Sequence, residues 1–140
     1  MEPTGAGLMD SLKHLGRPSN QPIDAVDLIE WKGERIVVRL EVADFTSLCP
    51  VTGQPDFGSL TLEYVPHRHL VETKSLKLYL WRYRNERGFN EALIDMIARD
   101  LWRQIQPRWL RLTGRFHPRG GIAVTAIAEH GEPQYRPPAG

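Results

Sequence analysis

The chain has 140 residues, of which 41% are hydrophobic, and a formal net charge of +1. These values are typical of one compact domain with its own core, and they give no electrostatic argument for nucleic acid as a partner. The sequence lacks an apolar run of about 20 residues, the length that spans a bilayer. Its first residues also lack the layout of a signal peptide. A single cysteine forms no internal disulfide, so we expect a cytoplasmic protein without a membrane partner.

Composition divides the chain into three parts. Residues 1–22 are rich in Gly, Pro and Ser, and we expect them to form a flexible N-terminal segment. Residues 23–130 carry the periodic apolar patterns and are expected to form one domain. Residues 131–140 have the composition of a loop and are expected to form a C-terminal tail.

Alternation of apolar and polar residues predicts strands, and apolar residues three and four apart predict helices. The patterns place strands at 35–42 and 59–65, helices at 72–84 and 89–105, and strands at 109–116 and 122–128. This β-β-α-α-β-β order predicts an α+β fold, with a four-stranded antiparallel sheet covered on one face by two helices. The edges of such a sheet need partners, which subunits closing side by side into a barrel would supply.

The cysteine lies in the stretch FTSLCPVTGQPDFG, which runs from Phe45 to Gly58. A lone cysteine is most often a small buried apolar residue, but its position among turn-forming prolines and glycine gives a functional role equal weight. A thiolate is a strong nucleophile, and an acid within reach can protonate the group that the thiolate attacks. We predict that the loop folds back and brings Asp56 near Cys49.

Two lysines, Lys74 and Lys77, follow at helical spacing, and we expect both to point away from the apolar face of their helix. Two ammonium groups near a helix start can bind a phosphate group, and Arg119 from the HPRGG turn could join them. The alternative is a solvated basic face with no ligand.

The second helix opens with Asn90 and Glu91. A carboxylate there is favoured by the helix dipole, or it can accept two hydrogen bonds from a guanine-like base. Asn90 could equally cap the helix. The histidines show no convincing metal-ligand spacing, so no metal is expected.

Four stretches, in this order, carry a resemblance to a known family: FTSLCPVTGQPDFG, VETKSLKLYLWRYRN, FNE and HPRGG. Between Phe45 and Gly121, their order and spacing resemble the nitrile reductase family of queuosine biosynthesis. Members of that family reduce 7-cyano-7-deazaguanine to 7-aminomethyl-7-deazaguanine with NADPH. The resemblance implies the tunnelling fold (T-fold) over residues 23–130 and a homo-oligomer such as a decamer of two pentamers.

The resemblance also implies roles for individual residues. Cys49 resembles the family's nucleophile, which forms a covalent thioimidate with the nitrile, and Asp56 resembles its proton donor. The substrate-binding residues would be Val71, Glu72, Thr73, Asn90 and Glu91, and the NADPH-binding residues would be Lys74, Ser75, Lys77 and Arg119.

The chain departs from the family pattern at Asn90, where a histidine usually precedes the purine-anchoring glutamate. The stretch NERGFNE also differs from the family's usual sequence, and Thr73 is a milder change. Asparagine forms hydrogen bonds but carries no titratable proton. Two alternatives to the reductase therefore stay open. One is an amidinotransferase-like relative that forms the thioimidate but accepts a nitrogen nucleophile, although its archaeal examples lack the lysine motif. The other is a deazapurine-binding module without turnover.

Overall fold

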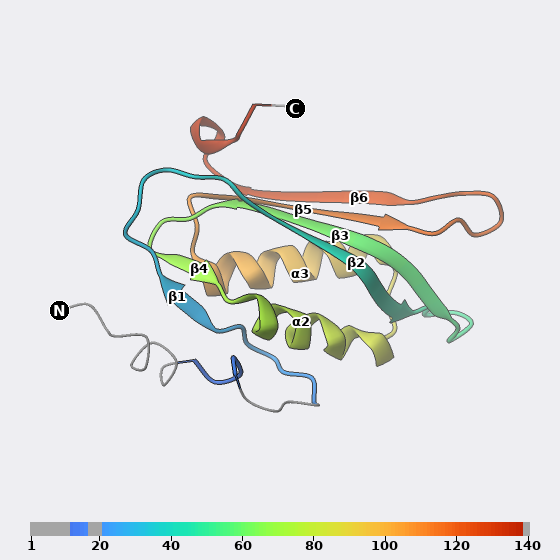
Figure 1. Cartoon of the computed structure of the whole chain (residues 1–140). Helices are drawn as coiled ribbons and strands as arrows, with labels where there is room; N and C mark the ends of the chain where they lie inside the picture. Colours follow the sequence, from blue (N-terminus) through green and yellow to red (C-terminus); the bar gives the residue numbers. More distant parts are fainter. Residues whose placement is uncertain (1–11, 17–20, 139–140) are drawn as a thin grey trace.

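The computed structural model describes residues 12–16 and 21–138 (Figure 1). Its elements, in chain order, are β1 (Leu28–Glu30), β2 (Val38–Leu48), β3 (Pro55–Val65), β4 (His69–Val71), α2 (Thr73–Trp81), a 3₁₀ helix (Arg82–Asn85), α3 (Asn90–Ile105), β5 (Trp109–Phe116), β6 (Thr125–Gly131) and a 3₁₀ turn (Pro133–Tyr135). No helix among the described residues is long and apolar enough to span a membrane.

The main sheet has four antiparallel strands in the order β2-β3-β5-β6. Both helices lie on one of its faces (Figure 1), so the predicted α+β class and four-stranded antiparallel sheet are confirmed. Alternate residues of the strands, such as Leu60 and Leu62 of β3 and Leu110 and Leu112 of β5, pack in a core with the helices. The predicted bounds of β5 agree with the structure.

Three of the predicted strands have wrong boundaries. The strand predicted at 35–42 is β2, which begins later, at Val38, and continues to Leu48, because a bulge shifts the register between Val42 and Phe45 and breaks the alternation of the sequence. The strand predicted at 59–65 begins earlier, at Pro55. The last strand lies three residues beyond the predicted 122–128, because a tight turn occupies the residues before it.

The helix predicted at 72–84 is an α-helix that tightens into a 3₁₀ helix after Trp81. Glu72 is its N-cap, and the carboxylate accepts hydrogen bonds from the backbone N–H groups of Lys74 and Ser75. In α3 the cap position is Phe89 and Asn90 is the first helical residue, so Asn90 is not the helix cap.

A second, two-stranded sheet of β1 and β4 was not predicted, since three-residue strands are too short to show a period. It is held to α2 through Asp27, whose backbone N–H donates to Ser75 Oγ and whose carbonyl accepts from the backbone N–H of Glu72. The Asp27 carboxylate accepts backbone N–H bonds from Lys13 and His14. Most of the predicted flexible segment, residues 1–11 and 17–20, lies outside the described residues.

The two faces of the main sheet differ in chemistry. On the helix face, α3 approaches so closely that a Cβ at Gly114 would lie 2.5 Å from Ile94 Cδ1. On the other face, the Glu63 carboxylate is buried between the guanidinium groups of Arg39 and Arg111, at 3.1 and 3.0 Å. Charge-assisted hydrogen bonds from both arginines satisfy this buried carboxylate.

Helices α2 and α3 are joined by a buried polar network. The Tyr79 hydroxyl donates to the Asp100 carboxylate at 2.6 Å and lies 3.1 Å from the Tyr83 hydroxyl. Gln104 Nε2 donates to the same carboxylate at 3.0 Å. Burial, reinforced by the hydrogen bond to Asp100, raises the pKa of Tyr79, so its hydroxyl remains a donor at all physiological pH values.

We therefore expect Tyr79→Phe to lower the free energy of unfolding by about 2 kcal/mol, because it removes a hydrogen bond to a charged group inside the core. Tyr135→Phe is the matched control, since its hydroxyl accepts only a 3.4 Å bond from exposed Arg108. The control should change stability by about 0.5 kcal/mol or less. Urea denaturation measures both, and equal losses would contradict the network's role.

Candidate active site

Cys49 lies at the start of a tight turn between β2 and β3. Its backbone N–H donates to the Gln54 carbonyl at 2.8 Å, and its carbonyl accepts from the Gly53 N–H at 2.9 Å. Gly53 has φ of +71°, a conformation that favours glycine. The turn leaves Cys49 only 8% exposed. The loop thus folds back as predicted, and it presents the thiol at one end of the sheet.

Hydrogen bonds in this turn favour the thiolate form of Cys49. The side chain and backbone N–H of Thr52, followed by the backbone N–H of Val51, lower the pKa of Cys49 to about 6, against the opposing effect of burial. The Arg119 guanidinium lowers this pKa further. The lowered pKa favours the nucleophilic thiolate near neutral pH. Sequence reasoning missed Thr52, although a hydroxyl three residues after a cysteine in a turn was a usable signal.

Asp56 lies directly across from Ser47 in the pairing of β2 with β3. Strand alternation places it on the same side as Gly58 and Leu60, which is the helix side of the sheet. Its carboxylate is 11% exposed and forms an ion pair with Arg119, with Arg119 Nη2 2.9 Å from Asp56 Oδ1. Because Arg119 also acts on the Cys49 thiol, it joins Asp56 and Cys49 into one cluster.

Arg119 reaches this cluster from the turn between β5 and β6, which lies at the same end of the sheet as the Cys49 turn (Figure 1). Arg119 and Ile122 exchange two backbone hydrogen bonds of 3.0 Å. Gly120 and Gly121 between them have φ of +56° and +81°, as a two-residue hairpin turn requires. Arg119, which was predicted to bind NADPH, thus contacts Asp56, the predicted proton donor.

The start of α3 is tied to the same end of the sheet. Leu48 N–H donates to the Glu86 carbonyl at 2.9 Å, and Gly88 N–H donates to the Leu48 carbonyl at 3.1 Å. Asn90 follows, and its Oδ1 is buried with no hydrogen-bond partner among the described residues. Glu91 is exposed and borders a groove between α3 and β6. The predicted purine-binding pair therefore follows a segment that is hydrogen-bonded to Leu48, the residue before Cys49.

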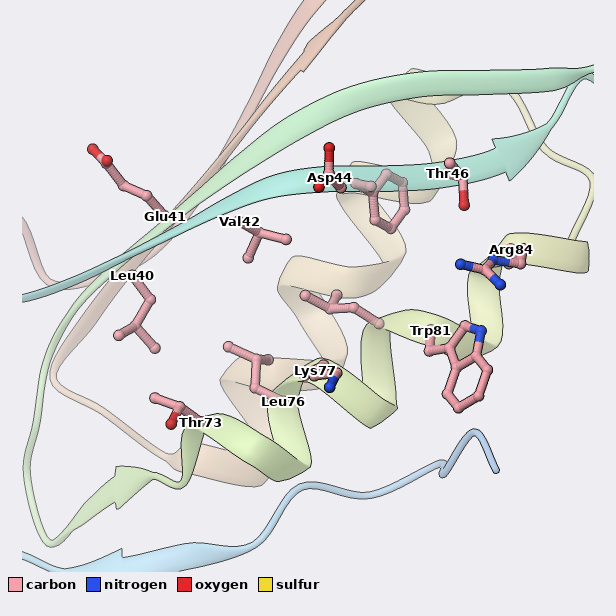
Figure 2. A pocket seen from close by; sticks show the side chains of 12 residues that line it. Leu40, Glu41, Val42, Asp44, Thr46, Thr73, Leu76, Lys77, Trp81 and Arg84 are labelled. Atoms are coloured by element: carbon pink, nitrogen blue, oxygen red, sulfur yellow. The ribbon is translucent and has the colours of Figure 1, made fainter. Parts of the chain in front are cut away.

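A cleft of about 440 Å³ runs between β2 and the helix side of the molecule, as Figure 2 shows. Lys77 and Thr73 line it together with Arg84, which sequence reasoning missed although it lies two helical turns beyond Lys77. The Arg84 guanidinium lies 5.6 Å from the centre of the Trp81 ring. In Figure 2 the carboxylate of Asp44, on the β2 side, points away from α2.

Cations therefore line the helix side of this cleft. Lys77 and Arg84 offer charge to a phosphate-bearing ligand, and Trp81 adjoins them with an aromatic face. Lys77 is exposed, in agreement with the prediction that it points away from the buried apolar residues, and it lines the cleft together with Leu76 and Leu80. Lys74 is half-buried and does not line the cleft.

The remaining predicted residues lie at the start of α2. Val71, Glu72 and Ser75 are buried, and the Ser75 hydroxyl donates to the Glu72 carbonyl at 2.8 Å while it accepts from Asp27. Within one chain they are separated from the Cys49 turn by the length of α2, about 14 Å at 1.5 Å per residue.

Among the described residues, no three His, Cys, Asp or Glu side chains are grouped as metal ligands. The described cluster offers a thiolate and a carboxylate, and the Arg119 guanidinium interacts with both. A thiolate can add to an electrophilic carbon, and the carboxyl group can pass a proton to the atom that becomes negative.

Comparisons with known proteins point to one family. A family model described as QueF-like protein matches residues 55–135. A protein of Halorhodospira halophila named NADPH-dependent 7-cyano-7-deazaguanine reductase is 57% identical over 66% of this chain and 79% of its own length. Proteins of the same name from Nitrosomonas eutropha and Thioalkalivibrio sulfidiphilus are 46% and 43% identical, each over 86% of this chain, and over 86% and 95% of their own lengths.

A solved structure supports the fold. The archaeosine synthase QueF-Like, in its apo form, matches with a TM-score of 0.64 over 69% of this chain and 94% of that chain, at 23% identity. The family model covers more than half of the sequence, and relatives of high identity cover most of it. The chain therefore belongs to the QueF-like protein family.

Proposed function

We propose that this protein reduces the nitrile group of 7-cyano-7-deazaguanine to the aminomethyl group of 7-aminomethyl-7-deazaguanine, with NADPH as the reductant. This reaction belongs to the biosynthesis of queuosine in tRNA. The observation that carries the proposal is the cluster of Cys49, Asp56 and Arg119. The printed names of relatives up to 57% identical support the substrate and the reductant.

In this proposal the Cys49 thiolate attacks the nitrile carbon and forms a thioimidate. A nitrile is a poor acceptor of hydride, and covalent addition converts it into a C=N group that accepts hydride more readily. The pKa of about 6 keeps Cys49 ionised at neutral pH without a separate base. The Asp56 carboxyl group provides a proton to the nitrile nitrogen.

NADPH would supply two hydrides in sequence, one from each of two molecules. The residues of the cleft fit the phosphate groups of such a molecule. Lys77 and Arg84 would bind those groups, and Thr73 would donate a hydrogen bond. Glu91 would accept two N–H bonds from the purine-like ring of the substrate.

We also infer that the complete site needs a second subunit. The two sheet edges are β2 and β6, and the Lys77 cleft lies along one while the Glu91 groove lies along the other. Exposed apolar side chains lie at β6 and at the start of α3, where Ile127 and Phe89 are each 63% exposed. Pairing of β2 with β6 of the next copy would cover both edges, close a T-fold barrel and unite the cleft with the groove.

One experiment tests the function as a whole. Purified protein is incubated with 7-cyano-7-deazaguanine, with and without NADPH, while NADPH absorbance and intact protein mass are followed. We expect a covalent mass increase without NADPH, and NADPH oxidation with release of the amine when both are present. An adduct that never consumes NADPH would instead support the amidinotransferase-like or binding-module alternative.

Cys49→Ala should abolish both the covalent adduct and NADPH oxidation, because it removes the nucleophile. Cys49→Ser should also fail, since a hydroxyl without a dedicated base is a far weaker nucleophile at neutral pH. Intact mass after incubation with substrate measures the adduct. An adduct of unchanged yield in the alanine variant would disprove the assignment of Cys49.

Lys77→Ala should raise the KM for NADPH about tenfold and weaken its dependence on salt, because one phosphate contact is lost. The rate of adduct formation without NADPH should stay unchanged. Lys32→Ala is the matched control, since Lys32 is exposed and pairs with Glu30 at 3.6 Å, away from the cleft. Equal losses in cofactor and substrate binding would point to a folding defect instead.

Asn90→His should increase the rate of reduction about tenfold, because histidine adds a positioned group that exchanges a proton near neutral pH. Affinity for the substrate should change little, since Glu91 is retained. Asn85→His is the matched control, because Asn85 is exposed at the end of the 3₁₀ helix. Single-turnover NADPH oxidation from pH 6 to 8 compares the variants, and no acceleration at any pH would contradict the prediction.

A further inference from the structure

Ser47 of β2 is a polar side chain that neither the fold nor the proposed mechanism uses. It is 0% exposed, and its hydroxyl is buried without a hydrogen-bond partner among the described residues. An unsatisfied buried hydroxyl generally costs stability. Alanine would fill nearly the same space without that cost, so packing alone does not account for a serine at this position.

Strand pairing places Ser47 beside the proposed acid. Ser47 and Asp56 are direct partners in the antiparallel pair of β2 with β3. Side chains of such partners lie on the same face of the sheet, with Cβ atoms about 4.5–5.5 Å apart. The Ser47 hydroxyl and the Asp56 carboxyl group therefore come within hydrogen-bond reach when one of the two side chains changes rotamer. Ser47 also lies only two residues before Cys49.

We propose that Ser47 is a positioning residue, whose hydroxyl binds the Asp56 carboxyl group in its protonated form and holds it in line with the nitrile nitrogen. This inference rests on the proposed function. It concerns how the acid is oriented when it acts, and it gives the unpartnered hydroxyl of Ser47 a partner during the reaction.

Arg119 and Ser47 suit different forms of Asp56. In the described structure Arg119 Nη2 lies 2.9 Å from Asp56 Oδ1, a contact that is strong when the carboxylate is charged. A protonated carboxyl group loses most of that attraction because it carries no charge. A hydroxyl group can both donate and accept, so Ser47 can bond to the neutral acid as well as to the carboxylate.

Ser47 changes no bond in the reaction. In the proposed addition the sulfur electron pair of Cys49 forms a bond to the nitrile carbon, one C–N π bond breaks, and the nitrogen takes the proton of the Asp56 carboxyl group. Ser47 keeps its own proton, and no co-reactant is needed. Its contribution is orientation, because an acid held in place needs no search for the productive geometry.

The first test is the rate of covalent adduct formation by Ser47→Ala with 7-cyano-7-deazaguanine, without NADPH, followed by intact mass at pH 7. The maximal rate should fall about tenfold, whereas the half-saturating substrate concentration should change less than about twofold, since Ser47 acts on the acid and not on the ring. Alkylation of Cys49 by iodoacetamide, which needs no acid, should keep its rate.

Stability separates this role from a packing role. Urea denaturation of Ser47→Ala should show an unchanged or higher midpoint, because the variant loses an unsatisfied buried hydroxyl. Ser59→Ala is the matched control, since Ser59 is a half-buried serine of β3 on the opposite face from Asp56. The control should form the adduct at the rate of the unmutated protein.

The second test asks whether Ser47 acts through Asp56. In an Asp56→Asn background, Ser47→Ala should slow adduct formation less than about twofold further, because the group that it positions is already gone. If both substitutions instead multiply their separate effects, Ser47 acts independently of Asp56 and the inference is wrong.

The remaining outcomes also decide between the proposals. An adduct rate in Ser47→Ala equal to that of the unmutated protein would overturn the positioning role and leave the proposed function intact. Slower alkylation together with a lower urea midpoint would also overturn it, because a general distortion of the turn would then explain the loss. If the unmutated protein forms no adduct, the proposed function fails and the role of Ser47 fails with it.

Discussion

The site depends on two backbone hydrogen bonds that Leu48 makes with Glu86 and Gly88. They join the end of β2 to the segment between the helices, which are otherwise separate parts of the chain. Through them, the turn that carries Cys49 and the helix start that carries Glu91 become one rigid unit. Side-chain contacts could drift with rotamer changes, but a pair of backbone bonds fixes the relative position of two chain segments, which is what a covalent mechanism needs.

Sequence patterns predicted the helices and the main sheet because those elements bury one regular face. They failed where local geometry departs from a period, at the bulge after Val42 and in the three-residue strands β1 and β4. In the site, the proline and glycine residues around Cys49 correctly predicted that this loop turns back on itself. The partner of Arg119 could not be predicted, because it depends on two hairpins that meet at one end of a sheet formed by distant strands.

Polar groups inside this protein serve two different purposes. Glu72 and Asp100 are used within the fold, where backbone N–H groups or hydroxyl and amide donors satisfy their carboxylates. The Asn90 oxygen is buried without a partner among the described residues, which costs stability unless a ligand or water completes it. The resemblance assigned both Glu72 and Asn90 to substrate binding, and the structure distinguishes them. The Glu72 carboxylate already accepts two backbone hydrogen bonds, whereas the Asn90 side-chain oxygen has no hydrogen-bond partner among the described residues.

The hairpin that carries Arg119 leaves little freedom in its length. Its tip is a two-glycine turn with left-handed backbone, closed by bonds between Arg119 and Ile122. Side chains alternate between the faces of a strand, so one inserted residue before the turn would direct the guanidinium away from Asp56. Loop tips ordinarily tolerate insertions such as affinity tags or fused domains. In this protein we expect the turn between β5 and β6 not to tolerate such insertions, although it is exposed, because its length sets the ion pair between Arg119 and Asp56.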